Sequence, residues 1–236
     1  MYKEEVIISS NDIDASLHVK IACLMRIIQD VIMHHTEVLG VGQSETIDKN
    51  IIWVVTRIKM EITRLPKYQE KVVIKTYPGQ TTAILYPRYL YIEDMNGNVI
   101  FRLSSIWALL NKETRQVTNS KIISERIVPE VHENELPLPE KVDIGEDIVL
   151  KETRKVHYSD VDLNGHLNFT KYIEYFEDLH NNDFYGKHHP KTIILNYSKE
   201  IKEGQTVNIY AFGNEVEKIK ITSDSGDHLF AEIHYQ

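Results

Sequence analysis

The chain contains an internal repeat, and this repeat limits the folds open to it more than any other feature of the sequence. Residues 11–30 can be laid over residues 159–178 without a gap, and several polar residues then coincide. The identical pairs are Asp12/Asp160, Asp14/Asp162, His18/His166 and Asp30/Asp178. Apolar positions also stay in register, as at Ile13/Val161 and Val19/Leu167. Two copies of one folding unit are therefore expected within the 236 residues.

Both copies show the same predicted order of elements, a long helix followed by antiparallel strands. Helical spacing of apolar residues runs from about residue 17 to residue 39, and again from Leu167 to Leu179. Strands are predicted near residues 51–62, 71–77, 83–93, 99–111, 148–158, 192–201, 206–212, 216–223 and 228–234. A second echo, Lys59-Met60-Glu61-Ile62 with Ser198-Lys199-Glu200-Ile201, supports the repeat.

This order of elements predicts an α+β fold. One long helix can bury its apolar stripe only if the strands of its own half wrap around it. The expected architecture is therefore a tandem, or double, hot-dog, in which each half is an antiparallel sheet wrapped around one helix. Residues 1–125 are predicted to form the first unit and residues 148–236 the second. Residues 126–147, which contain several prolines and glutamates, are predicted to be an acidic, solvated linker.

Composition excludes several classes of function. A net charge of −8 argues against a broad nucleic-acid surface, which needs a clustered basic face. No apolar run approaches the ~18–20 residues that a membrane span requires. The single cysteine, Cys23, cannot form an internal disulfide and fits a reducing compartment. The sequence thus predicts a cytoplasmic protein that binds neither nucleic acid nor membrane.

The most informative motif runs from Asp160 to Asn168 and precedes the second predicted helix. Asn164 and Gly165 fall where the first N–H groups of a helix lack partners and the helix dipole is positive. Glycine allows a ligand to approach the backbone closely. A backbone N–H at or just after His166 is therefore expected to stabilise the oxyanion formed in acyl transfer.

Hydrolysis also needs a base that accepts a proton from water. The candidates are Asp162, His166 and Glu200, and Glu200 is expected to lie on the more polar side of the strand predicted near residues 192–201. Glu200 is favoured, with Asp162 the open alternative.

Structural explanations compete with these functional ones. The Asp160–Gly165 segment is also what a helix-capping turn looks like, because Asp and Asn favour caps and Gly favours turns. His18 and Glu61, the first-half counterparts of His166 and Glu200, are predicted to be structural or pocket-lining residues. Cys23 is predicted to pack in the core. The His34-His35 and His188-His189 pairs lack the spacing of metal ligands, so no metal and no other cofactor is expected.

The motif Tyr158-Ser-Asp160-Val-Asp162-Leu-Asn164-Gly-His166-Leu-Asn168-Phe-Thr-Lys171-Tyr172 resembles the signature of the acyl-acyl carrier protein (acyl-ACP) thioesterases. The first-half segments Trp53-Val-Val-Thr-Arg57 and Ser105-Ile-Trp107-Ala-Leu resemble that family as well. The resemblance implies a tandem hot-dog enzyme with a substrate-shaping first half and a catalytic second half. The implied catalytic residues are Asp162, Asn164, His166 and Glu200. Plant members have a cysteine after this glutamate, but Ile201 follows it here, which excludes a thiol nucleophile at that position.

The resemblance implies hydrolysis of a fatty acyl thioester bound to acyl carrier protein, giving free fatty acid and the carrier thiol. Gly165 and Asn168 from the motif, and Trp53 and Trp107 from the first half, are the predicted substrate-binding residues. Rival functions are an acyl-coenzyme A thioesterase of the same fold and a noncatalytic acyl-binding module. A hot-dog dehydratase is disfavoured, because a His-containing motif that ends in Pro-Gly is not found ahead of the helix. A monomer is feasible, because two units in one chain supply the pairing that single units obtain by association, and the resemblance implies a homodimer as the alternative.

Overall fold

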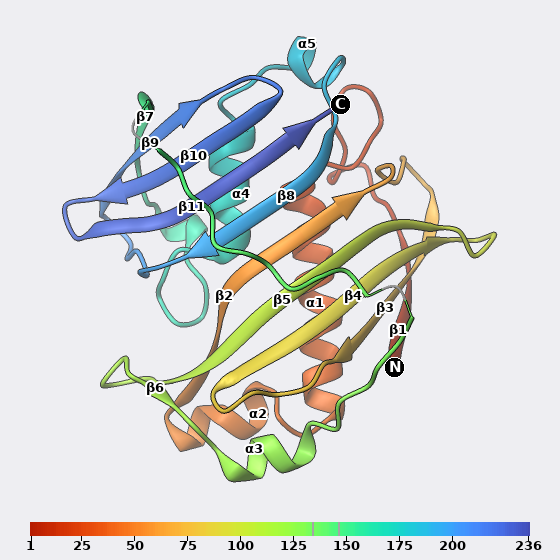
Figure 1. Ribbon diagram of the computed structural model, residues 1–236, viewed down its shortest axis with the longest axis vertical. Helices are drawn as coiled ribbons and strands as arrows, with labels where there is room; N and C mark the ends of the chain where they lie inside the picture. The colour runs from red at the N-terminus through yellow and green to blue at the C-terminus, as the bar shows by residue number, and fades with distance from the viewer. Residues whose placement is uncertain (134, 146) are drawn as a thin grey trace.

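The structure is a computed structural model that describes residues 1–133, 135–145 and 147–236 (Figure 1). Its strands are β1 (Tyr2–Ile7), β2 (Ile51–Ile62), β3 (Lys71–Pro78), β4 (Leu85–Asp94), β5 (Val99–Asn111), β6 (Val117–Thr118), β7 (Val149–Lys155), β8 (Pro190–Tyr197), β9 (Thr206–Phe212), β10 (Val216–Ser223) and β11 (Gly226–Tyr235). Its helices are α1 (Ile21–Val38), α2 (Gln43–Thr46), α3 (Lys121–Arg126), α4 (Phe169–Glu177) and α5 (Asn182–Tyr185).

The described strands form one 11-stranded antiparallel sheet. The strand order is β1-β3-β4-β5-β2-β8-β11-β10-β9-β7, with β6 paired to β5. The two halves of this order mirror each other about the β2–β8 pair: β8 corresponds to β2, β11 to β5, β10 to β4, β9 to β3 and β7 to β1. Strands β2 and β8 pair antiparallel from Arg57 opposite Asn196 to Glu61 opposite Thr192, which joins the two halves edge to edge. The predicted α+β double hot-dog is therefore confirmed, and the two sheets are continuous.

Helices α1 and α4 lie side by side against one face of this sheet (Figure 1). The apolar stripe of α1 is almost completely buried, with Leu24, Met25 and Ile28 at 1% exposure or less. Ile173 and Phe176 of α4 join the same core. Burying these stripes against the sheet removes apolar surface from water and is the main stabilising contribution. Within the described residues, no helix has both the length and the apolarity needed to cross a bilayer.

The two central helices are linked by hydrogen bonds near both of their N-termini. Glu177, at the end of α4, accepts the backbone N–H groups of Ile21 and Ala22 at 2.8 and 3.0 Å, at the start of α1. Gln29, which the repeat aligns with Glu177, accepts the side-chain N–H of Asn168 at 3.3 Å, just before α4 begins. Because the first N–H groups of a helix have no partner inside the helix, Glu177 caps α1. Gln29 contacts α4 only through the side chain of Asn168, which itself caps α4 by accepting the backbone N–H of Thr170.

The segment predicted to be a solvated linker is packed against the sheet. In Figure 1 it crosses β5, β2 and β8 on the face opposite α1. Pro137 O accepts the Ser104 hydroxyl, and the Asn196 side chain bonds both Val142 N–H and Glu140 O. The segment is therefore docked on the sheet at several points, with Leu136 and Val142 buried, while most of its described residues, Glu140 among them, are exposed as expected. The unit boundaries at residues 125 and 148 stay predictions.

Glu177 should give the folding stability a distinct pH dependence. Burial raises the pKa of its carboxyl to about 7, although the two backbone N–H groups partly oppose this. A carboxyl with a raised folded pKa stabilises the fold at low pH, and this contribution is lost as the pH rises through about 7. The variant Glu177→Gln cannot titrate at this position. As the pH rises from 5 to 8, we expect its free energy of unfolding to increase by about 1–2 kcal/mol relative to that of the unchanged protein.

The measurement is urea unfolding of both proteins at several pH values. Asp224→Asn, at an exposed carboxylate that follows β10, is the control and should show a much smaller pH-dependent difference. A difference in unfolding free energy between Glu177→Gln and the unchanged protein that stays constant from pH 5 to pH 8 would contradict the raised pKa of Glu177.

Candidate active site

The motif between η2 (Tyr158–Asp160) and α4 folds into a tight turn held by one carboxylate. Asp162 Oδ1 accepts the backbone N–H groups of Asn164 at 2.8 Å and His166 at 3.3 Å. Asp162 N–H donates to His166 O at 2.8 Å, and Gly165 N–H donates to Asp162 O at 2.9 Å. Gly165 has a φ of +74°, a conformation that costs glycine little. The turn therefore fixes the backbone positions of Asn164 and His166, from which their side chains extend.

The first half builds the same turn with other residues. Asp14 Oδ1 accepts the backbone N–H groups of Ser16 at 2.8 Å and His18 at 3.1 Å. Leu17 takes the place of Gly165 and has a similar φ of +65°. The sequence repeat is thus confirmed by matching hydrogen bonds. These bonds are a structural feature of both copies, and the copies differ in that Ser16 stands where the second has the amide of Asn164.

The expected oxyanion donors are already occupied. His166 N–H is bonded to Asp162, and Leu167 N–H donates to Ile201 O at 2.7 Å. The prediction that a backbone N–H at or just after His166 faces the substrate is therefore wrong for both groups. The donors are occupied because α4 begins only at Phe169, with Asn168 as its N-cap. The motif is therefore a turn that precedes the helix and is not the first turn of the helix itself.

Glu200 lies outside the strand in which the sequence predicted it. Strand β8 ends at Tyr197, and the chain then turns so that Ile201 pairs with Leu167 across the motif. Within β8, Tyr197 lines the cavity described below, whereas Asn196 bonds the segment on the opposite face. Continued alternation would have put Glu200 on the face of Asn196, away from the cavity. The break after Tyr197 brings Glu200 to the cavity.

The second sequence echo is out of register by four residues. In the second half, Leu167 N–H donates to Ile201 O, and His166 and Lys202 form a β-bridge. In the first half, Val19 N–H donates to Pro66 O, and His18 and Lys67 form the matching β-bridge. Leu65, which precedes Pro66, is therefore the structural counterpart of Glu200. Glu61 instead pairs with Arg102 on the neighbouring strand at 2.9 Å. The first half has no carboxylate at the position of Glu200.

Glu200 and His166 face each other, and a residue from the first half joins them. Glu200 Oε1 lies 3.7 Å from His166 Nδ1 and also forms an ion pair with the Arg115 guanidinium. Burial lowers the pKa of His166, and Arg115 lowers it further, although Glu200 opposes both. His166 is therefore neutral near pH 7. The sequence motifs did not predict a role for Arg115, because this residue lies far from the motif and belongs to the half without a counterpart of Glu200.

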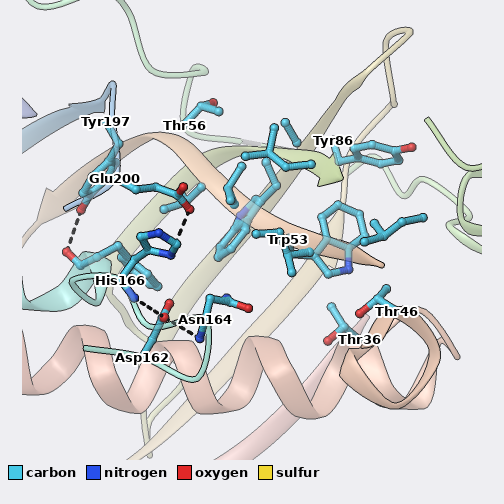
Figure 2. Close-up of a pocket in the computed structure, with 18 of the residues that line it drawn as sticks. Thr36, Thr46, Trp53, Thr56, Tyr86, Asp162, Asn164, His166, Tyr197 and Glu200 are labelled. Atoms are coloured by element: carbon cyan, nitrogen blue, oxygen red, sulfur yellow. Dashed lines mark hydrogen bonds and ion pairs between the residues drawn. The ribbon is translucent and has the colours of Figure 1, made fainter. Parts of the chain in front are cut away.

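These residues stand at one end of a cavity of about 830 Å³. Figure 2 shows Asp162, Asn164, His166 and Glu200 at this end, and Tyr86, Thr36 and Thr46 towards the other. Both halves contribute to its wall; the apolar and aromatic lining includes Ile32, Ile52, Trp53, Val55, Trp107, Phe169, Tyr172 and Tyr197. A volume within the ~300–1,000 Å³ range of small-molecule sites can hold an extended apolar chain.

The four residues predicted to bind substrate fall into two groups. Trp53 and Trp107 line the cavity, and their indole N–H groups donate to Val41 O and Ser105 Oγ. Gly165 and Asn168 are not among the described residues that line it. Asn168 Oδ1 instead accepts the backbone N–H of Thr170 at 2.9 Å and so caps α4. A contact of Gly165 or Asn168 with substrate stays a prediction.

The cavity wall also includes a buried arginine. Arg88 donates to His35 Nδ1 at 2.9 Å and to Thr76 Oγ1 at 3.3 Å. Burial lowers the pKa of Arg88 to about 10 and that of His35 to about 4, so His35 is neutral near pH 7 and can accept this bond. The lining is thus apolar over much of its extent but not throughout.

Asp14 offers a matched control for Asp162, because both hold the same turn. Asp14→Ala and Asp162→Ala should each destabilise the fold by about 1–2 kcal/mol, since each leaves two N–H groups without their acceptor. Only Asp162→Ala releases Asn164 and His166. Hydrolysis of an acyl thioester, the activity that the sequence resemblance implies, should therefore fall at least about 10-fold further in Asp162→Ala than in Asp14→Ala. Thermal unfolding and initial rates check this; equal losses of activity would contradict it.

Comparison with known proteins agrees with this geometry. The family profile for the acyl-ACP thioesterase N-terminal domain matches residues 1–128, and that for the C-terminal domain matches residues 146–234. Among curated relatives, a palmitoyl-acyl carrier protein thioesterase of Arabidopsis thaliana is 26% identical over 85% of this chain and 52% of its own. An oleoyl-acyl carrier protein thioesterase of the same plant is 25% identical over 88% and 61%. The chain therefore spans about half the length of these relatives.

Solved structures show the same fold over the whole chain. An acyl-ACP thioesterase from Bacteroides thetaiotaomicron has a TM-score of 0.88 at 20% identity, covering 99% of this chain and 97% of its own. A 12:0-ACP thioesterase from Umbellularia californica has a TM-score of 0.86 at 18% identity, covering 100% and 96%. Since the two family profiles together match most of its length, this chain belongs to the acyl-ACP thioesterase family.

Proposed function

We propose that the chain hydrolyses fatty acyl thioesters of acyl carrier protein. Water is consumed, the C–S bond breaks, and the products are a free fatty acid and the carrier thiol. The observation that carries this proposal is the cavity of about 830 Å³, largely apolar, with Asn164, His166 and Glu200 gathered at one end. An acyl chain in the cavity would present its thioester to these three side chains. The family and the names of the relatives agree with this substrate.

In the proposed mechanism, Glu200 accepts a proton from the attacking water. His166 Nδ1, 3.7 Å from Glu200 Oε1, is close enough to share that proton after a small movement. The Asn164 side-chain amide donates to the thioester oxygen as it becomes an oxyanion. Asn164 is favoured over the backbone because the N–H groups of His166 and Leu167 are bonded elsewhere.

Glu200 is favoured over Asp162 as the base because Asp162 is already committed. Its Oδ1 accepts two backbone N–H groups, and Asp14 makes the same two bonds in the half without a counterpart of Glu200. Asp162 therefore acts by holding Asn164 and His166 in place. Cys23 does not compete as a nucleophile, since it is buried in α1 and burial raises the pKa of its thiol.

Acyl carrier protein is the proposed carrier, and coenzyme A is the alternative. Lys112 and Lys199 are among the cavity-lining residues and could meet the phosphate that both carriers bear. Lys171 is a weaker candidate because it pairs with Glu174 at 2.9 Å and lies 3.6 Å from Asp160. A monomeric or homodimeric state and a cytoplasmic location stay predictions from the sequence.

Removing the proposed base should abolish turnover without unfolding the protein. We expect Glu200→Gln to lower kcat by about 100- to 10,000-fold and Asn164→Ala by about 100-fold or more, because each removes a group that acts in the transition state. Released thiol is measured with a palmitoyl-ACP substrate, and thermal unfolding checks the fold. Glu61→Gln, at a carboxylate already paired with Arg102, is the control. A near-normal rate in Glu200→Gln would refute its assignment.

A panel of substrates separates the rival functions. Acyl groups of several lengths are presented on acyl carrier protein and on coenzyme A, and kcat/KM is compared at fixed ionic strength. The proposal predicts a clear preference for the carrier protein with at least one chain length. Higher kcat/KM with coenzyme A esters would support the alternative carrier. Tight binding of acyl thioesters without thiol release would identify a noncatalytic module.

A further inference from the structure

Arg115 projects from a hairpin whose backbone is well fixed. The hairpin joins β5 to β6, and Asn111 organises it by accepting the N–H groups of Glu113 and Thr114 at its side-chain oxygen. Arg115 N–H donates to Asn111 O at 2.9 Å, and Asn111 N–H donates to Gln116 O at 2.9 Å. Arg115 has a φ of +56°, as the tight turn requires. These bonds fix the direction in which the Arg115 side chain leaves the first half.

The guanidinium of Arg115 meets the active-site carboxylate of the second half. It forms an ion pair with Glu200 Oε1, the same oxygen that lies 3.7 Å from His166 Nδ1. The side chains of Arg115 and Glu200 are only 30% and 34% exposed, and both line the cavity. The Glu200 carboxylate is thus placed between a cation from one half and an imidazole from the other.

Apart from the His166 ring at 3.7 Å, Arg115 is the only ion-pair partner of this carboxylate within the described residues. Glu200 follows the end of β8, so regular strand structure does not orient it. The next backbone contacts are at Ile201 and Lys202, and the side chain can rotate about three bonds between there and its carboxylate. The ion pair with one nitrogen of the Arg115 guanidinium restricts that freedom.

We propose that Arg115 is a positioning residue of the active site, contributed by the first half, which holds the Glu200 carboxylate against His166. This inference rests on the proposed function of Glu200 as the base. It gives the first half a direct part in the chemistry, beyond shaping the acyl cavity. A stabilising role alone would be weak, because partly exposed ion pairs contribute only about 0–1 kcal/mol.

The charge on Arg115 should also be visible at His166. The groups that act on the His166 ring are Glu200 and Asp162, which raise its pKa, and Arg115 and Lys202, which lower it. Burial is the largest effect and also lowers it. Removing Arg115 therefore leaves the negative charge of Glu200 less compensated, and the pKa of His166 should rise.

The test compares Arg115→Met with Arg102→Met. Arg102 also pairs with a glutamate, Glu61, at similar exposure, so its replacement removes an ion pair of the same kind away from the cavity. Rates are measured with an acyl-ACP and with the same acyl group on N-acetylcysteamine, a small thiol without phosphate. Arg115→Met should lower kcat by about 10- to 100-fold on both substrates, as expected for a displaced base. Arg102→Met should keep its rate, and both variants should unfold at similar temperatures.

Two further readouts exclude a purely structural or phosphate-binding role. In Arg115→Met, the pH at which His166 titrates by NMR should move upward, and the matching limb of the kcat profile should move with it. Arg115→Lys, which keeps the charge on a differently shaped side chain, should recover the His166 pKa and part of the rate.

Three outcomes would overturn the inference. The first is a normal rate in Arg115→Met. The second is a loss confined to KM with the carrier substrate, which would make Arg115 a phosphate anchor. The third is an unchanged His166 titration. If the unmodified protein releases no thiol from any thioester, the proposed function itself fails; activity in the unmodified protein with no effect of Arg115→Met rejects only the role of Arg115.

Discussion

The pairing of β2 with β8 is the interaction on which the rest of the structure depends. It joins the two halves at the strands that each half places at the inner edge of its sheet. The pairing leaves neither of these two strands with an open edge, a usual site of aggregation. It also sets α1 beside α4, so that Glu177 of α4 can accept the first backbone N–H groups of α1. The cavity between the halves, with walls from both, follows from the same junction.

Duplication explains both the symmetry of the molecule and its single proposed site. The two motif turns share their aspartate, their backbone bonds and their histidine. They differ at the position of Asn164, which is Ser16 in the first copy, and at that of Glu200, which is Leu65. The first copy therefore retains the turn, which stabilises the fold, without the amide and carboxylate proposed to act in hydrolysis. Its hairpin residue Arg115 reaches across to the copy that has both.

Much of the fold could be predicted from the sequence because the local spacing of apolar residues indicates helices and strands. Helix α1 and strands such as β2, β5 and β9 are found close to their expected ranges, since apolar spacing reports directly on which face is buried. The segment after β8 was predicted wrongly, because nothing local shows that the strand stops at Tyr197. That stop depends on Leu167 N–H, from a distant turn, which bonds Ile201 O. Register between distant segments is a tertiary property.

The sequence by itself determined the duplication, the α+β order of elements and the residue types able to perform acyl chemistry, because repeats, periodicity and motifs are properties of the chain alone. Only the tertiary structure decided how these residues act together. It committed Asp162 to the turn, bonded the backbone N–H groups of His166 and Leu167, and brought Arg115 to Glu200. The physical reason is that hydrogen-bond partners and ion pairs depend on distances between segments remote in sequence, and packing of the two halves sets those distances.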